Sequence, residues 1–485
     1  MKPSMKTSTT LKRQIAIFAA VLAASASLDA KITLPEIIGD DMVLQQQTQA
    51  RLWGTATPKA TVTITPSWSG ETVKVKAGKD GHWIASVTTP QASYTPYSIE
   101  ISDGEPLTVS NVLIGEVWFC GGQSNMEMPL NGFWNSPIEG SNEEIATAGR
   151  RNGIRLVKIP KTGTLAPSET VEGKWESSNP QNARWFSATA WFFARMLNEA
   201  LDVPVGLLSC NWGGTRVESW LPEEIVRTYS DIDYDTECCK MEQTWWHYSN
   251  VTIMYNGMYY PIRNYTVRGF IWYQGEANVG KHGTYPERFK TLVEIWRENQ
   301  GCESPVYLAE LAPWLYGGDG TSGARFREMQ HELAREIPNC GVICTNDLVY
   351  PDEDIQIHPR NKRGVGERLA YLALNQTYKQ DGVECRYPEY KSFTVNGDTA
   401  EVFFDNAEDG FSPWKGLEGF EVAGEDKVFH KADAWVNTDH RSVMVRSSEV
   451  PAPVAVRYCF RDFQIGNLRS GRDLPVIPFR TDNWK

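Results

Sequence analysis

Between residues 112 and 346 the chain alternates apolar runs with longer amphipathic stretches. The apolar runs are almost continuous, which is typical of strands buried on both faces of a parallel sheet, and the amphipathic stretches have helical spacing. The predicted strands are 112–119, 154–159, 203–210, 269–274, 305–311 and 341–346, and the predicted helices include 187–201, 285–299 and 325–337. This pattern predicts an α/β fold in which helices cover a parallel sheet.

On either side of this region, hydrophobic and polar positions alternate with the period of strands. From residue 31 to about 110, short segments such as TVTITP and YSIEIS are separated by Gly, Pro and Asp, and alternation returns beyond about residue 380. We therefore predict an N-terminal β-sandwich domain (31–110), a central catalytic domain (111–378) and a C-terminal β domain (379–485). A structural role is favoured over glycan binding for the N-terminal domain.

Residues 1–30 differ from the rest of the chain. Lys12 and Arg13 precede an apolar run at 15–24, and small residues follow up to Ala30, which is typical of a secretory signal peptide. The run is too short to span a bilayer, which takes about 20 helical residues. We expect residues 1–30 to be removed and the mature protein to be periplasmic or extracellular, without a membrane span.

Composition excludes several functional classes. The 485 residues carry a net charge of −12, which argues against a basic nucleic-acid-binding protein. The nine cysteines cannot all pair, and their spacing matches neither a disulfide scaffold nor a zinc site. We expect no metal and leave the disulfides and the oligomeric state open.

A serine lies where the predicted strand 112–119 gives way to a helix, in the stretch GGQSNMEM at 121–128. Ligands of such sheets bind beyond the carboxyl ends of the strands, and paired glycines permit a tight turn there. Ser124 would present its hydroxyl and its own N–H to the same space, as a nucleophile and an oxyanion donor require. A simple helix N-cap is the alternative.

Two further strand ends carry hydrogen-bond donors. In NWGGTRVESW (211–220), the pair Gly213 and Gly214 could aim a backbone N–H at an oxyanion or could simply form a turn. In WYQGEAN (272–278), Gln274 and Asn278 offer side-chain amides beside the carboxylate of Glu276. Amides are recognised oxyanion donors, but satisfied structural amides are equally compatible with this pattern.

His358 follows the predicted strand 341–346 and precedes a helix, so it is the candidate general base. The group that orients its ring is open, because position 355, three residues earlier, is isoleucine. Asp354 could bend toward the ring, or Gln356 or a backbone carbonyl could accept its N–H. We expect a Ser124–His358 dyad with an unassigned third member.

Taken together, the motifs resemble the sialate O-acetylesterase family of carbohydrate esterases, within the SGNH hydrolase superfamily. They are GEVWFCGGQSNMEMP, NWGGTRVESWLP, YNGMYYPI, IWYQGEAN and IHPRNKRGVGERLA, with PEIIGDDMVLQQ near the start and RDLPVIPFRTDNW near the end. The resemblance implies an SGNH-type, flavodoxin-like sheet flanked by β domains, and no cofactor. It also implies Ser124 as nucleophile, His358 as base, and oxyanion donors at Ser124, Gly214 and either Gln274 or Asn278.

The implied activity is that of a secreted serine carboxylic-ester hydrolase that removes O-acetyl groups from glycans through an acetyl-serine. The 9-O-acetyl group of sialic acid is the first expected substrate, and acetylated xylan or xyloglucan is the alternative. A catalytically inactive glycan-binding protein is a further alternative, because the superfamily's aspartate before the histidine is Ile355 here. A lipase-like esterase is disfavoured because no long apolar lid is evident.

Several side chains are candidates for binding the sugar. Arg216 could pair with a sialic carboxylate, since guanidinium groups suit carboxylates, or it could form a structural ion pair. Glu276 is a second candidate contact. Tryptophans that could stack on sugar rings or pack between domains are Trp134, Trp175, Trp185, Trp245, Trp246 and Trp314.

Overall fold

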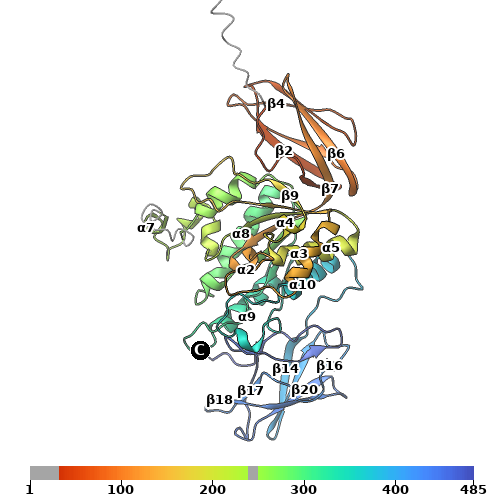
Figure 1. Ribbon diagram of the computed structural model, residues 1–485. Coiled ribbons are helices and arrows are strands. Elements are labelled where there is room, and N and C mark those ends of the chain that lie inside the picture. Colours follow the sequence, from red (N-terminus) through yellow and green to blue (C-terminus); the bar gives the residue numbers. More distant parts are fainter. Residues whose placement is uncertain (1–31, 239–249, 485) are drawn as a thin grey trace, which may run out of the picture.

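The computed structural model describes residues 32–238 and 250–484. An N-terminal β domain, a central α/β domain and a C-terminal β domain follow one another along the molecule (Figure 1). The predicted signal peptide, Cys239, Trp245 and Trp246 lie outside the described residues. Within the described ranges, no helix has the length and apolarity needed to cross a membrane.

The central sheet has the strand order β13-β12-β11-β7-β10-β8-β9. Its neighbouring strands pair in parallel, except for the short edge strand β9, which is antiparallel to β8. Each predicted strand is present in it. The strands are β7 (Pro106–Gly122), β8 (Ile154–Lys158), β9 (Trp175–Ser177), β10 (Val205–Asn211), β11 (Gly269–Tyr273), β12 (Val306–Ala309) and β13 (Cys340–Ile343).

Helices cover both faces of this sheet, as the apolar runs predict. Because side chains alternate along a strand, Trp118 of β7 faces α5 (Ala188–Leu201) and α10 (Lys362–Gln376), whereas Phe119 faces α8 (Tyr285–Gln300) and α9 (Ser322–Glu336). The shorter helices are α2 (Ser124–Glu127), α3 (Ser141–Thr147), α4 (Pro180–Ala183), α6 (Glu223–Val226) and α7 (Tyr234–Cys238). Single helical turns are η1 (Ala148–Arg150), η2 (Val217–Trp220), η5 (Tyr255–Tyr259), η6 (Tyr260–Ile262), η7 (Glu276–Asn278) and η8 (Pro351–Glu353).

The long strand β7 links the N-terminal β domain to the central sheet. Its first half pairs with β6 and β1, and its second half pairs with β10 and β11. The predicted domain boundary at residue 110 therefore falls inside a continuous strand. The other strands of this domain are β1 (Val43–Gln45), β2 (Gln49–Thr55), β3 (Thr61–Pro66), β4 (Val73–Lys76), β5 (His82–Thr88) and β6 (Ser93–Ser102).

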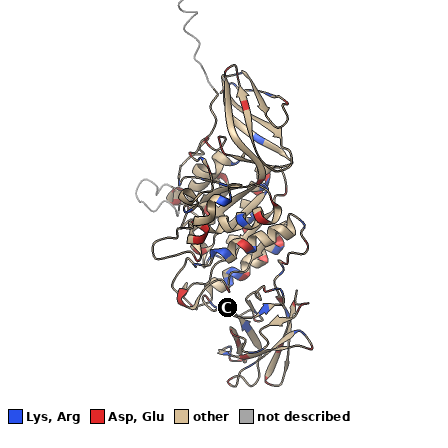
Figure 2. Cartoon of the chain, turned by 45° about the vertical axis from the view of Figure 1, so that its right-hand side comes forward, with Lys and Arg blue, Asp and Glu red and all other residues tan. Residues whose placement is uncertain are grey.

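The C-terminal domain begins after α10 and packs two antiparallel sheets around its own apolar core. Their strand orders are β14-β15-β20-β19 and β18-β17-β21-β23, and β16 pairs with β22. The strands are β14 (Glu389–Asn396), β15 (Thr399–Asp405), β16 (Phe411–Ser412), β17 (Phe420–Ala423), β18 (Phe429–Lys431), β19 (Asp433–Asn437), β20 (Ser442–Arg446), β21 (Ala455–Tyr458), β22 (Arg469–Ser470) and β23 (Phe479–Arg480). Acidic and basic residues are distributed over all three domains (Figure 2).

The eight cysteines within the described ranges form no disulfide with one another, so Cys340 and Cys344 remain separate thiols. Most are buried, and burial raises the pKa of the Cys120 thiol. Among the described residues, no group of three or more His, Cys, Asp or Glu is placed to hold a metal ion.

Candidate active site

The nucleophile turn lies between β7 and α2. Gly122 has φ 139°, and a Cβ at this position would lie 2.2 Å from the carbonyl oxygen of Tyr273, so the turn requires glycine. The next residue, Gln123, donates its N–H to the same carbonyl at 2.9 Å. Ser124 is thereby the first residue of α2, and its backbone N–H has no acceptor in the described chain.

A second glycine turn, after β10, lies against Ser124. A Cβ on Gly213 would lie 3.2 Å from the Cβ of Ser124. The N–H of Gly213 is already used, because it donates to Oε2 of Glu127 at 2.7 Å, and Lys161 pairs with the other oxygen of that carboxylate at 2.6 Å. Gly214, with φ 81°, has an N–H that donates to no acceptor in residues 32–238 or 250–484, so it is the available backbone donor of this turn.

The amide of Gln274 uses both of its N–H groups within the described chain, whereas Asn278 uses one of its two. Both side chains are fully buried. The side-chain NH2 of Gln274 donates to Asn278 Oδ1 at 2.8 Å and to the carbonyl of Thr215 at 3.1 Å, and the NH2 of Asn278 donates to Glu218 at 3.0 Å. The hydrogen bonds of Gln274 fix the turn that carries Gly214, and the oxyanion role expected for Asn278 stays a prediction.

Asn125, the residue after the nucleophile, connects three segments of the site. Its Nδ2 donates to the carbonyl of Ile357 at 3.0 Å and also to the carboxylate of Glu276, and its Oδ1 accepts from Lys362 Nζ at 2.7 Å. Ile357 directly precedes His358. This one side chain therefore holds the nucleophile turn beside the loop of the candidate base.

The imidazole of His358 packs edge-on against the ring of Phe133, with ring centroids 5.2 Å apart. Burial of the ring and the neighbouring ammonium of Lys362 lower the pKa of His358 to about 4. The ring is consequently neutral at ordinary pH, and a neutral imidazole is the form that can accept a proton from a serine.

The two candidate orienting residues bind the backbone of the loop. The carboxylate of Asp354 accepts the N–H of Ile355 at 2.9 Å. Gln356 accepts the backbone N–H of His358 at 3.3 Å and donates to the carbonyl of Asn135 at 3.2 Å. In the described chain no carboxylate hydrogen-bonds to the ring of His358. The ring-orienting role considered for Asp354 and Gln356 is therefore not what this structure shows.

A buried pair of opposite charges lies behind the nucleophile turn. Lys362 is fully buried, and burial lowers the pKa of its ammonium to about 7. Burial raises the pKa of Glu276, and its Oε2 has no hydrogen-bond partner in the described structure. The carboxylate of Glu276, expected as a substrate contact, thus lies in a buried cluster with Asn125 and Lys362.

The pKa of His358 predicts the acid limit of catalysis. Because the base must be neutral, kcat/KM is expected to stay high as the pH falls and to decline only near pH 4. Lys362→Met removes one of the two causes of the lowered pKa, so the midpoint of this decline should move to higher pH. Lys290→Met, at a lysine paired with Glu336, is the control for lost charge. A general loss of rate with an unmoved midpoint would contradict this coupling.

Some candidate sugar-binding residues are engaged in structural contacts, and others are exposed. Arg216 pairs with Glu237 at 2.5 Å, which matches the structural ion pair considered for it. Trp175 is 4% exposed and belongs to the core, whereas Trp134 is 92% exposed and Trp185 is 52% exposed. Trp134 follows the Phe133 that contacts His358, so it is the exposed indole next to the candidate base.

Three site residues were missed by sequence reasoning. Asn125 and Glu127 belong to the same QSNME stretch as Ser124, and Lys362, four residues after His358, is the first residue of α10. The feature that could have identified each of them is a polar side chain at a position that the fold largely buries. Recognising it requires knowledge of which distant segment packs against each one.

Residues 114–375 match the model of a family described as carbohydrate esterase, sialic acid-specific acetylesterase. The chain belongs to this family. The protein is therefore a carboxylic ester hydrolase of the carbohydrate O-acetylesterase type, as the motifs predict.

Individual relatives agree with this assignment. The sialate O-acetylesterase of Pongo abelii is 30% identical over 391 residues, covering 70% of this chain and 72% of that protein. The Homo sapiens sialate O-acetylesterase is 29% identical over 388 residues, with the same shares. A crystal structure of a carbohydrate acetylesterase from Xanthomonas citri has 32% identity and a TM-score of 0.81, covering 94% of this chain and 100% of that one. The predicted fold, a parallel sheet covered by helices and flanked by β domains, is confirmed.

Proposed function

We propose that this esterase is exported and removes acetyl groups from glycans through an acetyl-serine on Ser124. The observation that carries the proposal is the Asn125 side chain, which ties the turn of Ser124 to the residue before His358. A serine at a glycine-rich turn, tied to the loop of a neutral, half-buried imidazole, suits nucleophilic catalysis.

The reaction proceeds in two steps. His358 accepts the proton of the Ser124 hydroxyl while Oγ attacks the acetyl carbonyl carbon, and the resulting oxyanion is held by the N–H groups of Ser124 and Gly214. The intermediate collapses, and the sugar hydroxyl leaves with the proton from His358. Water then attacks the acetyl-serine with His358 again as base, releasing acetate and restoring Ser124.

Orientation of His358 does not depend on an aspartate in this proposal. The ring is packed by Phe133, and the loop backbone is fixed by Gln356 and Asn125. These contacts position the loop and one face of the ring, and the proposal assigns no carboxylate to His358.

Export is supported by the sequence of residues 1–30. A basic pair, an apolar run and small residues follow one another in the order of a secretory signal peptide. The mature protein would then meet glycans in the periplasm or outside the cell.

The 9-O-acetyl group of sialic acid is the first proposed substrate, on the strength of the family description. A second candidate is an acetylated neutral polysaccharide such as xylan or xyloglucan. The ion pair of Arg216 with Glu237 favours this second candidate, because a guanidinium that already binds one carboxylate binds a sialic carboxylate less well.

Acetate release from acetylated sialoglycans, xylan and xyloglucan, measured side by side, tests the proposal. We expect turnover on at least one of them, and the ranking identifies the substrate. No release above that of Ser124→Ala on any of the three would contradict the proposal and favour an inactive glycan-binding protein.

Trp134 is expected to act as a platform for the sugar. Its indole is 92% exposed beside the base loop, and stacking on an aromatic ring contributes about 0.5–1.5 kcal/mol. Trp134→Ala should raise KM for the acetylated glycan about threefold to tenfold and leave the turnover of a small aromatic acetate within about twofold. Trp414→Ala, at a 66% exposed indole of the C-terminal domain, is the matched control. Equal KM values in both variants would show that Trp134 is a bystander.

A further inference from the structure

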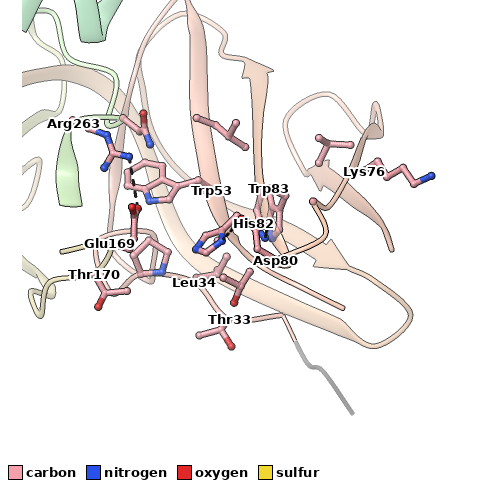
Figure 3. A pocket seen from close by; sticks show the side chains of 17 residues that line it. Thr33, Leu34, Trp53, Lys76, Asp80, His82, Trp83, Glu169, Thr170 and Arg263 are labelled. Carbon is pink, nitrogen blue, oxygen red and sulfur yellow. Dashed lines mark hydrogen bonds and ion pairs between the residues drawn. The ribbon is translucent and has the colours of Figure 1, made fainter. Parts of the chain in front are cut away.

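A cavity of about 680 Å³ lies between the N-terminal β domain and the α/β domain (Figure 3). From the β domain it is lined by Trp53 of β2 and by His82 and Trp83 of β5, and from the α/β domain by Glu169 and Arg263. Its size is within the range of ligand-binding pockets, about 300–1,000 Å³.

The cavity is separate from the nucleophile turn. Arg263 and Asn264, which line it, precede β11, whereas Gln274 at the active site follows β11. One loop reaches both places, because Lys161 pairs with Glu127 beside Ser124 and Glu169 lines the cavity. A polymer bound at the cavity would thus also contact the α/β domain, which carries the catalytic groups.

We propose that this cavity binds a segment of a neutral glycan chain. The proposal rests on the chain's membership of a carbohydrate esterase family and does not depend on the serine mechanism. It gives the N-terminal β domain a binding function in place of the purely structural role that the sequence favoured.

Charge balance argues for a neutral ligand. Arg263 pairs with Glu169 at 3.6 Å, so the guanidinium in the lining is already compensated, and the carboxylate of Asp80 lies 3.3 Å from Nδ1 of His82. Lys76 also lines the cavity, but Figure 3 shows its ammonium directed away from the other lining side chains. A strongly anionic sugar would find no uncompensated positive charge here.

The chemistry of the lining matches a sugar. Pyranose rings have apolar C–H faces and a rim of hydroxyls. The cavity offers an exposed apolar side chain, Ile84 (46% exposed), over a wall that contains the largely buried Trp53 and Trp83, together with polar groups. The side chains of Asp80, His82 and Glu169 are 69%, 54% and 56% exposed, so their polar atoms are accessible to hydroxyl groups.

The test measures binding in the Ser124→Ala background with deacetylated xylan and xyloglucan, which offer no acetyl ester to the catalytic groups. We expect both polysaccharides to retard the protein in affinity electrophoresis. The double variant His82→Ala/Glu169→Ala should lose affinity about tenfold, because hydrogen bonds to charged groups are removed. The thermal transition shows whether the double variant is folded. If it is not, the milder Glu169→Gln is used in its place and should also weaken binding.

His440→Ala is the matched control, because His440 forms a similarly exposed pair with Glu401 on the C-terminal domain. It should bind like the parent protein. The proposal is overturned if the parent is not retarded by either polysaccharide, if the cavity variants bind as well as His440→Ala, or if polysialic acid binds more tightly than the neutral chains. Loss of acetate release in Ser124→Ala is a separate measurement, so the two proposals can fail independently.

Discussion

Ser124→Ala is expected to lower the turnover of an aromatic acetate by at least about 10⁴-fold, because it removes the atom that attacks the carbonyl. The backbone donors of Ser124 and Gly214 remain, so a small residual rate over the uncatalysed reaction is expected. Initial rates across a range of ester concentrations measure the effect, and it should appear in kcat.

Ser141→Ala is the matched control for this variant. Ser141 is also the first residue of a helix, α3, and is partly exposed, so its replacement perturbs a helix start without touching the site. It should keep the parental rate, and both variants should show the parental thermal transition. Retention of more than a tenth of the activity by Ser124→Ala would rule out Ser124 as the nucleophile.

His358→Asn is expected to lower kcat by about 10³–10⁴-fold, which is the range for losing a general base next to a serine. Asparagine preserves polarity and approximate size but cannot accept the proton. The variant should also lose the acid limb near pH 4 that the lowered pKa of His358 imposes. Rates over a pH series measure both effects together.

The control for this second variant is His282→Asn, at an exposed histidine of the same domain. It should leave both the rate and the acid limb unchanged. An acid limb that persists in His358→Asn would mean that another group titrates, and Lys362 or Glu276 would then be the first to examine.

Much of the fold could be predicted because its signals are local. The continuous apolar runs predicted the parallel strands, and the paired glycines before Ser124 predicted a tight turn. The structure explains the second glycine, since a side chain on Gly122 would meet the carbonyl of Tyr273. The short edge strand β9 gave too little periodicity to be recognised.

The parts of the site that could not be predicted depend on contacts between distant segments. Whether Gly213 or Gly214 offers a free N–H is decided by Glu127, which lies 86 residues from Gly213. Likewise, the amide of Gln274 is engaged by Thr215 and Asn278, and one N–H of Asn278 is engaged by Glu218. Residue type and spacing cannot show which hydrogen bonds are already made.

The most direct test of the account is to look for the acetyl-enzyme. The protein is mixed with excess aromatic acetate, quenched in acid during turnover and digested, and the peptide that contains Ser124 is examined by mass spectrometry. The account predicts an acetyl group on Ser124, absent in Ser124→Ala and present at normal yield in Ser141→Ala. An active enzyme without acetylated Ser124, or with the acetyl group on another residue, would contradict it.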